Sequence, residues 1–205
     1  MQHLTAGRFG PLPSEFCTAS APTVLDSWSP TELAAILGQR HAVRSFTAEP
    51  VRVDQVASIA ACAYSADERL WPSHVHGDVG LSITVAARNV NGLPRGLHRI
   101  DRSGARSAIA GDDALLEALA RDLADAPVLL LIGADLGSAC ARSESGYGAA
   151  LVRCGSLGYA AWLAAIHAGL SGCAHGGSHP LVTAAYVADG RAGRHMFSIS
   201  VGAAT

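Results

Sequence analysis

The spacing of apolar residues predicts two amphipathic helices near the start of the chain. The first begins at Ser29–Glu32, where proline occupies a first helical position, and has apolar side chains at positions 33, 36 and 37. The second follows Pro50, with apolar side chains at positions 53, 56, 59 and 60. Residues 1–28 lack such a period and are rich in Pro, Ser, Thr and Gly, so they predict an irregular arm.

A different pattern predicts strands in the middle of the chain. Leu81–Val85 alternates between apolar and polar residues, and Leu97–Ile100 follows a set of turn-forming residues as its return strand. The remaining elements are a helix capped by Gly111–Asp113 and running through Leu123, a buried strand at Pro127–Ile132 and a closing strand at Met196–Val201.

The longest predicted element is a helix at Tyr147–Leu170. It is apolar on nearly every face, as is typical of a helix in a core or a subunit interface. Gly169 ends it, and His175–Pro180 reads as a glycine-rich loop. With no internal repeat and no linker in view, these elements predict an α+β fold, with one domain at 29–205 following the arm at 1–28.

Composition adds an expectation about assembly and partners. Only 16% of the 205 residues are charged and 49% are hydrophobic, so we expect a second subunit to cover part of the apolar surface in a homodimer. The formal net charge of −2 gives no reason to expect nucleic acid or an anionic membrane as a partner. The five cysteines include no Cys-x-x-Cys pair and predict reduced thiols in a cytoplasmic protein.

Several chemistries are excluded by missing residues. The chain has no lysine, so no step can use a lysine base or a Schiff base, and the lysine-containing phosphate loop is ruled out. No G-x-G-x-x-G follows a strand, so any nicotinamide would bind transiently rather than in a dinucleotide fold. No G-x-S-x-G elbow supports a serine hydrolase.

Arg40–Phe46, directly after the first helix, resembles the N-terminal signature of the nitroreductase-like flavoproteins. The resemblance implies that Arg40, His41 and Arg44 hold the phosphate and nearby edge of FMN, although that family usually has a hydroxyl residue where this chain has Ala42. Guanidinium groups suit a phosphate dianion because they donate paired, charge-assisted hydrogen bonds. An isolated pair of arginines with this spacing is more often a solvated basic face.

The segment Gly169–Gly177 is similar to the part of that family whose backbone passes the N5 edge of the flavin. Glycine suits such a position because the absence of Cβ lets the main chain approach a ring closely. The resemblance therefore implies that Gly176 and Gly177 line the N5 side. The ordered set of motifs covers about residues 30 to 202 and implies the nitroreductase-like fold, with a mostly antiparallel sheet and FMN at the interface of a dimer.

Within this class, the SagB-type dehydrogenases are the branch that the chain resembles most. Trp71-Pro72-Ser73, the segment Asn89–His98 and Tyr147 carry that likeness, which implies that Pro72 and Ser73 lie near the ring system. Members of the branch typically oxidise azoline rings in peptides to azoles with FMN. Here Ala141-Arg142 replaces their usual Lys-Tyr pair, so another residue must take the proton, and the candidates are Tyr147, His74, His76 and His175.

The resemblance implies an FMN-dependent oxidoreductase that transfers hydride between a peptide-derived natural-product intermediate and flavin N5, with NAD(P)H or oxygen as redox partner. The alternatives are an NAD(P)H-dependent nitro or ene reductase and a degenerate member that serves as a non-catalytic partner or peptide-binding scaffold. A metal site is a third alternative, built from His74, His76, Cys173, His175 and His179. Their spacing matches no strong zinc pattern, so we expect no metal.

Overall fold

The computed structural model describes residues 28–103, 106–109 and 113–205, so the predicted arm lies outside the described residues except for Trp28. The helices are α1 (Pro30–Gln39), α2 (Val53–Leu70), α3 (Ser73–His76), α4 (Asp113–Asp122), α5 (Leu136–Arg142), α6 (Gly146–His167) and α7 (Pro180–Ala188). The strands are β1 (Val51–Arg52), β2 (Ser82–Ala87), β3 (Val90–Asn91), β4 (Gly96–Ile100), β5 (Arg106–Ile109), β6 (Val128–Ala134), β7 (Ser171–Gly176) and β8 (Arg194–Gly202).

Six strands form one sheet in the order β5-β4-β2-β6-β8-β7, and every neighbouring pair in it is antiparallel. A short parallel pair, β1 with β3, stands apart from this sheet. The predicted α+β fold with a mostly antiparallel sheet is confirmed, as are the predicted return strand at β4 and the closing strand at β8.

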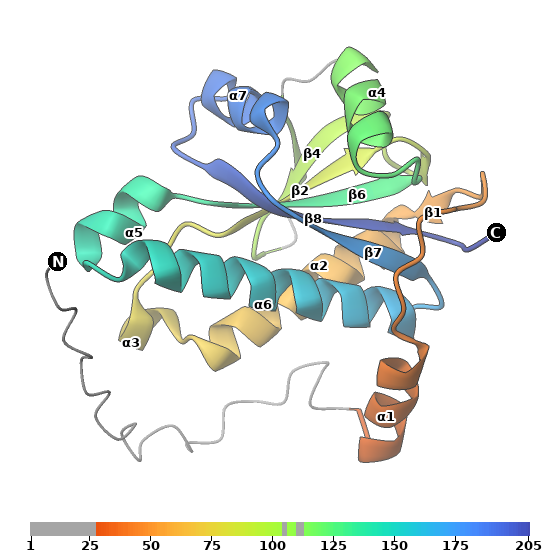
Figure 1. The fold of residues 1–205 in the computed structure, drawn as a ribbon, viewed down its shortest axis with the longest axis horizontal. Coiled ribbons are helices and arrows are strands. Elements are labelled where there is room, and N and C mark those ends of the chain that lie inside the picture. The colour runs from red at the N-terminus through yellow and green to blue at the C-terminus, as the bar shows by residue number, and fades with distance from the viewer. Residues whose placement is uncertain (1–27, 104–105, 110–112) are drawn as a thin grey trace, which may run out of the picture.

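Helices cover both faces of the sheet. Figure 1 shows α2 and α6 below the sheet and α4 and α7 above it. All seven residues of β6 are buried for this reason. β2 alternates in sequence, yet five of its six residues are buried, because the polar Thr84 lies beneath the upper helices instead of facing water. The predicted strand at 81–85 is therefore confirmed, although both of its faces are covered.

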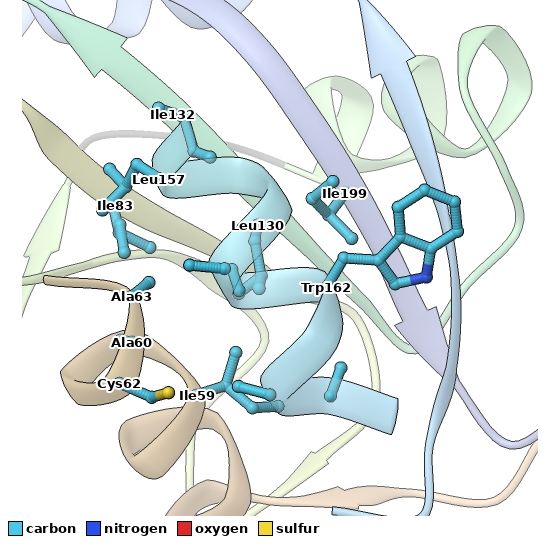
Figure 2. Packing of buried hydrophobic residues seen from close by; sticks show 14 of the residues in the cluster. Ile59, Ala60, Cys62, Ala63, Ile83, Leu130, Ile132, Leu157, Trp162 and Ile199 are labelled. Carbon is cyan, nitrogen blue, oxygen red and sulfur yellow. The ribbon is translucent and has the colours of Figure 1, made fainter. Parts of the chain in front are cut away.

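The main core lies between α6, α2 and the lower face of the sheet. Figure 2 shows Leu157 of α6 beside Ile83 of β2 and Ile132 of β6, with Ile59 of α2 farther along the same helix, and all are nearly inaccessible to solvent. A Cβ added at Gly158 would lie 2.4 Å from a ring carbon of Phe197, so glycine here lets α6 lie close to β8. This contact fixes the helix against the sheet.

The first helix begins as the sequence predicts. Ser29 is its N-cap, and Ser29 and Glu32 exchange hydrogen bonds in a capping box. Of the predicted apolar face, Ile36 is buried while Leu33 and Leu37 remain exposed. α1 lies beside the C-terminal end of α6 and contacts that helix along one side (Figure 1). For this reason Ile36 is covered and the other two apolar residues are not.

The segment after α6 differs from the prediction. β7 occupies Ser171–Gly176 and pairs along its whole length with β8, so the first two residues of the predicted loop at 175–180 belong to a strand. Gly and Ala are depleted in strands, so the pairing with β8 supplies the structure instead. α6 itself is long and apolar enough to cross a membrane by composition, but 67% of its apolar window is buried inside the protein, as in a core helix.

Candidate functional site

The Arg40–Phe46 motif lies along the outer edge of β7. Ala42 forms a parallel bridge with Gly172, and the Val43 amide donates to the Gly172 carbonyl at 3.0 Å. The motif is extended rather than helical, so the four residue-to-residue steps from Arg40 to Arg44 span up to about 13 Å. The two arginines therefore stand on one extended segment beside β7, not at a helix end.

Arg40 packs on the aromatic face of α6. Its guanidinium carbon lies 5.2 Å from the Trp162 ring centroid and 5.9 Å from that of Tyr159. Stacking of this kind holds a cation in place without neutralising it. Arg40 and Arg44 have no ion-pair partner among the described residues, so both positive charges stay available to an anion.

His41 is exposed, and its Nδ1 lies 2.8 Å from the Gln39 carbonyl oxygen. It lines a cavity of about 430 Å³ between the C-terminal ends of α1 and α6 and the start of β7. Ser171 and Gly172 line the same cavity, so the structure brings His41 next to the strand that leads to the glycines.

His175 is half-buried near the end of β7. Its pKa is lowered by burial and by the nearby Arg44, so the ring is neutral at neutral pH. The Ser200 hydroxyl donates to the Cys173 carbonyl at 3.2 Å, so it must accept from His175 Nε2, which lies 3.1 Å away. This assigns the proton to Nε2 and leaves Nδ1 with a free lone pair.

Gly176 and Gly177 follow His175 at an open part of the surface. Nothing lies within 4 Å of a Cβ built at either position, and Gly177 has a φ of +110°, which favours glycine. The next residues are held from behind: the His179 amide donates to Nδ1 of His195 at 2.8 Å, and His195 Nε2 donates to the Ser198 hydroxyl at 2.9 Å. The glycines therefore face open space, while the residues after them are held to the protein by the hydrogen bond to His195.

The remaining predicted site residues lie elsewhere. Pro72 is half-buried and caps α3, Ser73 donates from its amide and hydroxyl to Glu68, and His74 is exposed on the same short helix. Tyr147 is 51% exposed at the start of α6. Twelve residues of helix separate it from Tyr159, a rise of about 18 Å.

Within one chain, therefore, the predicted residues form two groups. The first, at the C-terminal end of α6 and along β7, contains Arg40, His41, Arg44, His175, Gly176 and Gly177. The second, at the N-terminal end of α6, contains Pro72, Ser73, His74, His76 and Tyr147.

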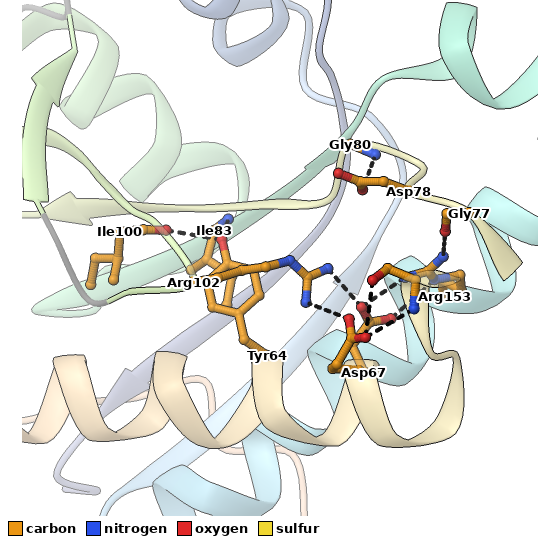
Figure 3. A network of polar contacts seen from close by, with 11 residues as sticks. Tyr64, Asp67, Gly77, Asp78, Gly80, Ile83, Ile100, Arg102 and Arg153 are labelled. Atoms are coloured by element: carbon orange, nitrogen blue, oxygen red, sulfur yellow. Dashed lines mark hydrogen bonds and ion pairs between the residues drawn. The ribbon is translucent and has the colours of Figure 1, made fainter. Parts of the chain in front are cut away.

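A buried ionic network supports the second group (Figure 3). Arg153 of α6 is 2% exposed and holds the Asp67 carboxylate through two hydrogen bonds, of 3.1 and 2.8 Å, while its third nitrogen donates to the Gly77 carbonyl at 2.9 Å. Arg102 adds a further contact to Asp67 at 2.9 Å. Two cations thus neutralise one buried carboxylate and tie the segment after α3 to α6.

Sequence reasoning missed this network and the anchors of the glycine loop. One signal was present: Arg153 interrupts an otherwise apolar helix, and an arginine in such a place needs a buried partner. No such indication exists for Asp67 or Ser200, because the residues with which they form hydrogen bonds lie in distant parts of the chain.

No group of three metal-ligating side chains gathers anywhere in the described residues. The histidines of α3 lie at a different part of the surface from those near β7. Cys173 is buried and donates to the Ala174 carbonyl, and burial raises the pKa of Cys154 to about 12 and that of Cys62 to about 11. These two thiols are therefore protonated at neutral pH.

Comparisons with known proteins identify the family of this chain. Residues 37–190 match the model of the nitroreductase family. Among curated proteins none matches this chain.

Solved structures with the same fold include a candidate nitroreductase of Ralstonia eutropha, with 20% identity and a TM-score of 0.65 over 84% of this chain and 83% of that one. A candidate nitroreductase of Anabaena variabilis has 17% identity and a TM-score of 0.66; the match covers 85% of this chain but only 38% of that protein. The E. coli microcin synthetase McbBCD complex, with truncated pro-MccB17 bound, contains a chain with 15% identity and a TM-score of 0.62 over 97% of this chain and 79% of its own.

Proposed function

Because this chain belongs to the nitroreductase family, we propose that it is an FMN-dependent oxidoreductase that acts in the cytoplasm on a peptide-derived intermediate. The observation that carries the proposal is the first group of residues. An unpaired arginine, a neutral histidine and an open glycine loop lie together on one edge of the sheet. None of the described cysteines forms a disulfide, which is consistent with a reducing compartment.

The residues present fit FMN. Arg44 is exposed and unpaired, and it would bind the phosphate through charge-assisted hydrogen bonds, with Arg40 and His41 beside it. Gly176 and Gly177 leave room for a flat ring against their backbone. When bound there, FMN supplies an N5 atom that exchanges a hydride with the substrate.

The protein's own contribution is to hold the reacting groups and to move a proton. Oxidation of an azoline ring removes a hydride from one ring atom and a proton from the neighbouring one, and a double bond forms between the two. Nδ1 of His175 carries a lone pair in the tautomer fixed by Ser200 and would accept that proton. Tyr147 would donate a hydrogen bond from its hydroxyl group to the substrate.

The first test is the visible absorption spectrum of the purified protein, with identification of any released chromophore. FMN is the expected result. Arg44→Ala and Arg40→Ala should each weaken FMN binding about tenfold or more, as expected for the loss of a charge-assisted contact. Arg52→Ala, at an exposed arginine of β1, is the matched control and should bind FMN normally. Colourless protein that takes up no added FMN would overturn the proposal.

We further propose a homodimer. Tyr147, Leu151, Val152 and Tyr159 form an exposed apolar stripe along α6, and Val152 is 57% exposed. If a two-fold axis crosses this helix, the α6 helices of two copies run antiparallel. The N-terminal end of one helix then lies beside the C-terminal end of the other, which would join the two separated groups of predicted residues into one site.

The dimer can be tested by complementation. Arg44→Ala and Tyr147→Phe chains are each expected to have low activity, because each lacks one half of every site. A mixture refolded together should recover activity, since a mixed dimer contains one site with both native halves. Val152→Glu should give monomers that have lost FMN. A stable monomer with full flavin occupancy would refute the shared site.

The substrate class is proposed from the microcin synthetase complex, a structure of the same fold solved with a peptide bound. Anaerobic mixing with a thiazoline-containing peptide should bleach the flavin absorbance, and Tyr147→Phe should slow that bleaching without changing flavin content. Bleaching by NAD(P)H and turnover of nitro compounds, with no response to the peptide, would favour a nitro or ene reductase. Retained flavin with no reduction by either would favour a peptide-binding scaffold.

A further inference from the structure

The upper face of the sheet carries two adjoining cavities that no part of the proposed flavin chemistry uses. One has a volume of about 250 Å³ and lies over β2 and β4 beside the end of α7. The other, of about 320 Å³, lies over β4 and β5. Both are lined by Arg99 and Arg191, so the two cavities adjoin at these side chains in one depression. Its described lining residues include none from the candidate flavin site.

Arginines and hydroxyl groups dominate the lining. Arg99 projects from β4, Arg106 from the edge strand β5 and Arg191 from the loop after α7. The hydroxyl groups belong to Ser82, Thr84, Ser107 and Tyr186.

Asp101 and Asp135 also line the depression, and each of these carboxylates accepts hydrogen bonds from a nearby serine. Asp135 accepts hydrogen bonds from the Ser138 amide and hydroxyl, and Asp101 accepts them from Ser103. Asp189 pairs with Arg191.

Arg99 and Arg106 have no such partner. Neither forms an ion pair within the described part of the chain, and the Nε atom of Arg99 is buried without a hydrogen-bond acceptor. A buried donor on a cation is costly unless an acceptor satisfies it. Arg99 therefore lines both cavities with a cationic side chain that no carboxylate of the described residues pairs with.

We propose that this depression binds a small organic or inorganic oxyanion, a carboxylate or a phosphate ester, through Arg99 and Arg106. The planar guanidinium group matches the oxygens of both kinds of anion, and the serine and threonine hydroxyls supply further donors. Each cavity is below or near the lower end of the range for drug-sized ligands, so the ligand is a compact molecule rather than a dinucleotide. The site is separate from Arg44 and does not depend on the proposed function.

The experiment is calorimetric titration of the full-length protein as purified with inorganic phosphate and, separately, with succinate, at ionic strength held constant with sodium chloride. The Arg44→Ala variant separates this binding from any binding of phosphate in the Arg44 region. Binding of one anion per chain is expected. Arg106→Gln, a change at an exposed side chain, should weaken it about tenfold or more, and Arg99→Gln should weaken it at least as much.

Arg52→Gln and Arg44→Ala are the controls, and both should bind the anion as the wild type does. The stronger of the two anions identifies the ligand as a phosphate ester or a carboxylate. Arg99→Gln also has a signature without ligand: removal of an uncompensated cation should leave the melting temperature unchanged or raised. Equal binding by all variants, loss of binding only in Arg44→Ala, or no binding above chloride would each overturn the proposal.

Discussion

His195 offers a sharp test of the network behind the glycine loop, because it is fully buried and its titration is coupled to folding. Burial lowers its pKa from 6.5 to about 4, with the His179 charge acting in the same direction and a hydrogen bond opposing both. In the folded protein Nδ1 is already occupied by the His179 amide and Nε2 donates to Ser198. A second proton would break the first of these bonds.

These two pKa values determine how the free energy of unfolding changes with pH. Above about pH 6.5 His195 is neutral whether the chain is folded or unfolded, so it has no effect on pH dependence. As the pH falls below 6.5 the unfolded chain takes up a proton that the folded chain refuses. The free energy of unfolding therefore drops, by about 2 kcal/mol at pH 5 and about 3 kcal/mol at pH 4, from 1.36 kcal/mol per pKa unit.

The perturbation is His195→Asn, which keeps an acceptor for the His179 amide but does not titrate. Urea denaturation at pH 7.5, 6, 5 and 4.5 should show the variant less stable than wild type at pH 7.5. The gap should close by about 2 kcal/mol by pH 5. All other groups titrate in both proteins and cancel in the difference. His41→Asn, at an exposed histidine, is the control. Parallel stability curves for wild type and His195→Asn would refute the reasoning.

Two other predictions concern packing and the buried pair. Asp67→Asn removes the carboxylate that neutralises the buried Arg153, and urea denaturation should show a loss of about 3–5 kcal/mol; a loss below about 1 kcal/mol would mean that Arg153 finds another partner or water. Gly158→Ala places a Cβ 2.4 Å from Phe197 and should cost about 1–3 kcal/mol by thermal unfolding. Gly148→Ala, on the same helix with nothing within 4 Å, should be neutral or slightly stabilising, and equal effects at both positions would contradict the close packing of α6.

Elements with a strong local signal were predictable from the sequence. The start of α1 is predicted by the N-cap Ser29 and by Pro30 at the first helical position. The apolar residues spaced along the chain after Pro50 belong to α2. The continuous apolar run at 127–132 became the central strand β6. In each case the information lies within about a dozen neighbouring residues, which is the range over which capping and periodicity act.

Elements that depend on a distant partner were not predictable. β7 was read partly as a loop, because glycines and small residues mark no strand until β8 pairs with them. α3, α5 and α7 were also missed, since α3 and α5 are short, and the apolar residues of α7 are buried only where it contacts β8. For the site, the order of motifs led to Arg40, Arg44, His175 and the glycines, and the roles of these residues stay predictions.

The sequence by itself determined the fold class, the main helices and strands, and the residue types that a flavin site would need. Only the tertiary structure decided that Arg40 stacks on α6 while Arg44 stays free, and that Tyr147 lies about 18 Å of helix away from Tyr159. It also decided which nitrogen of His175 carries the proton, and that Arg99 has no counterion among the described residues. The reason is physical: periodicity and capping are local, whereas charge pairing, tautomers and the meeting of two groups depend on distances between residues far apart along the chain.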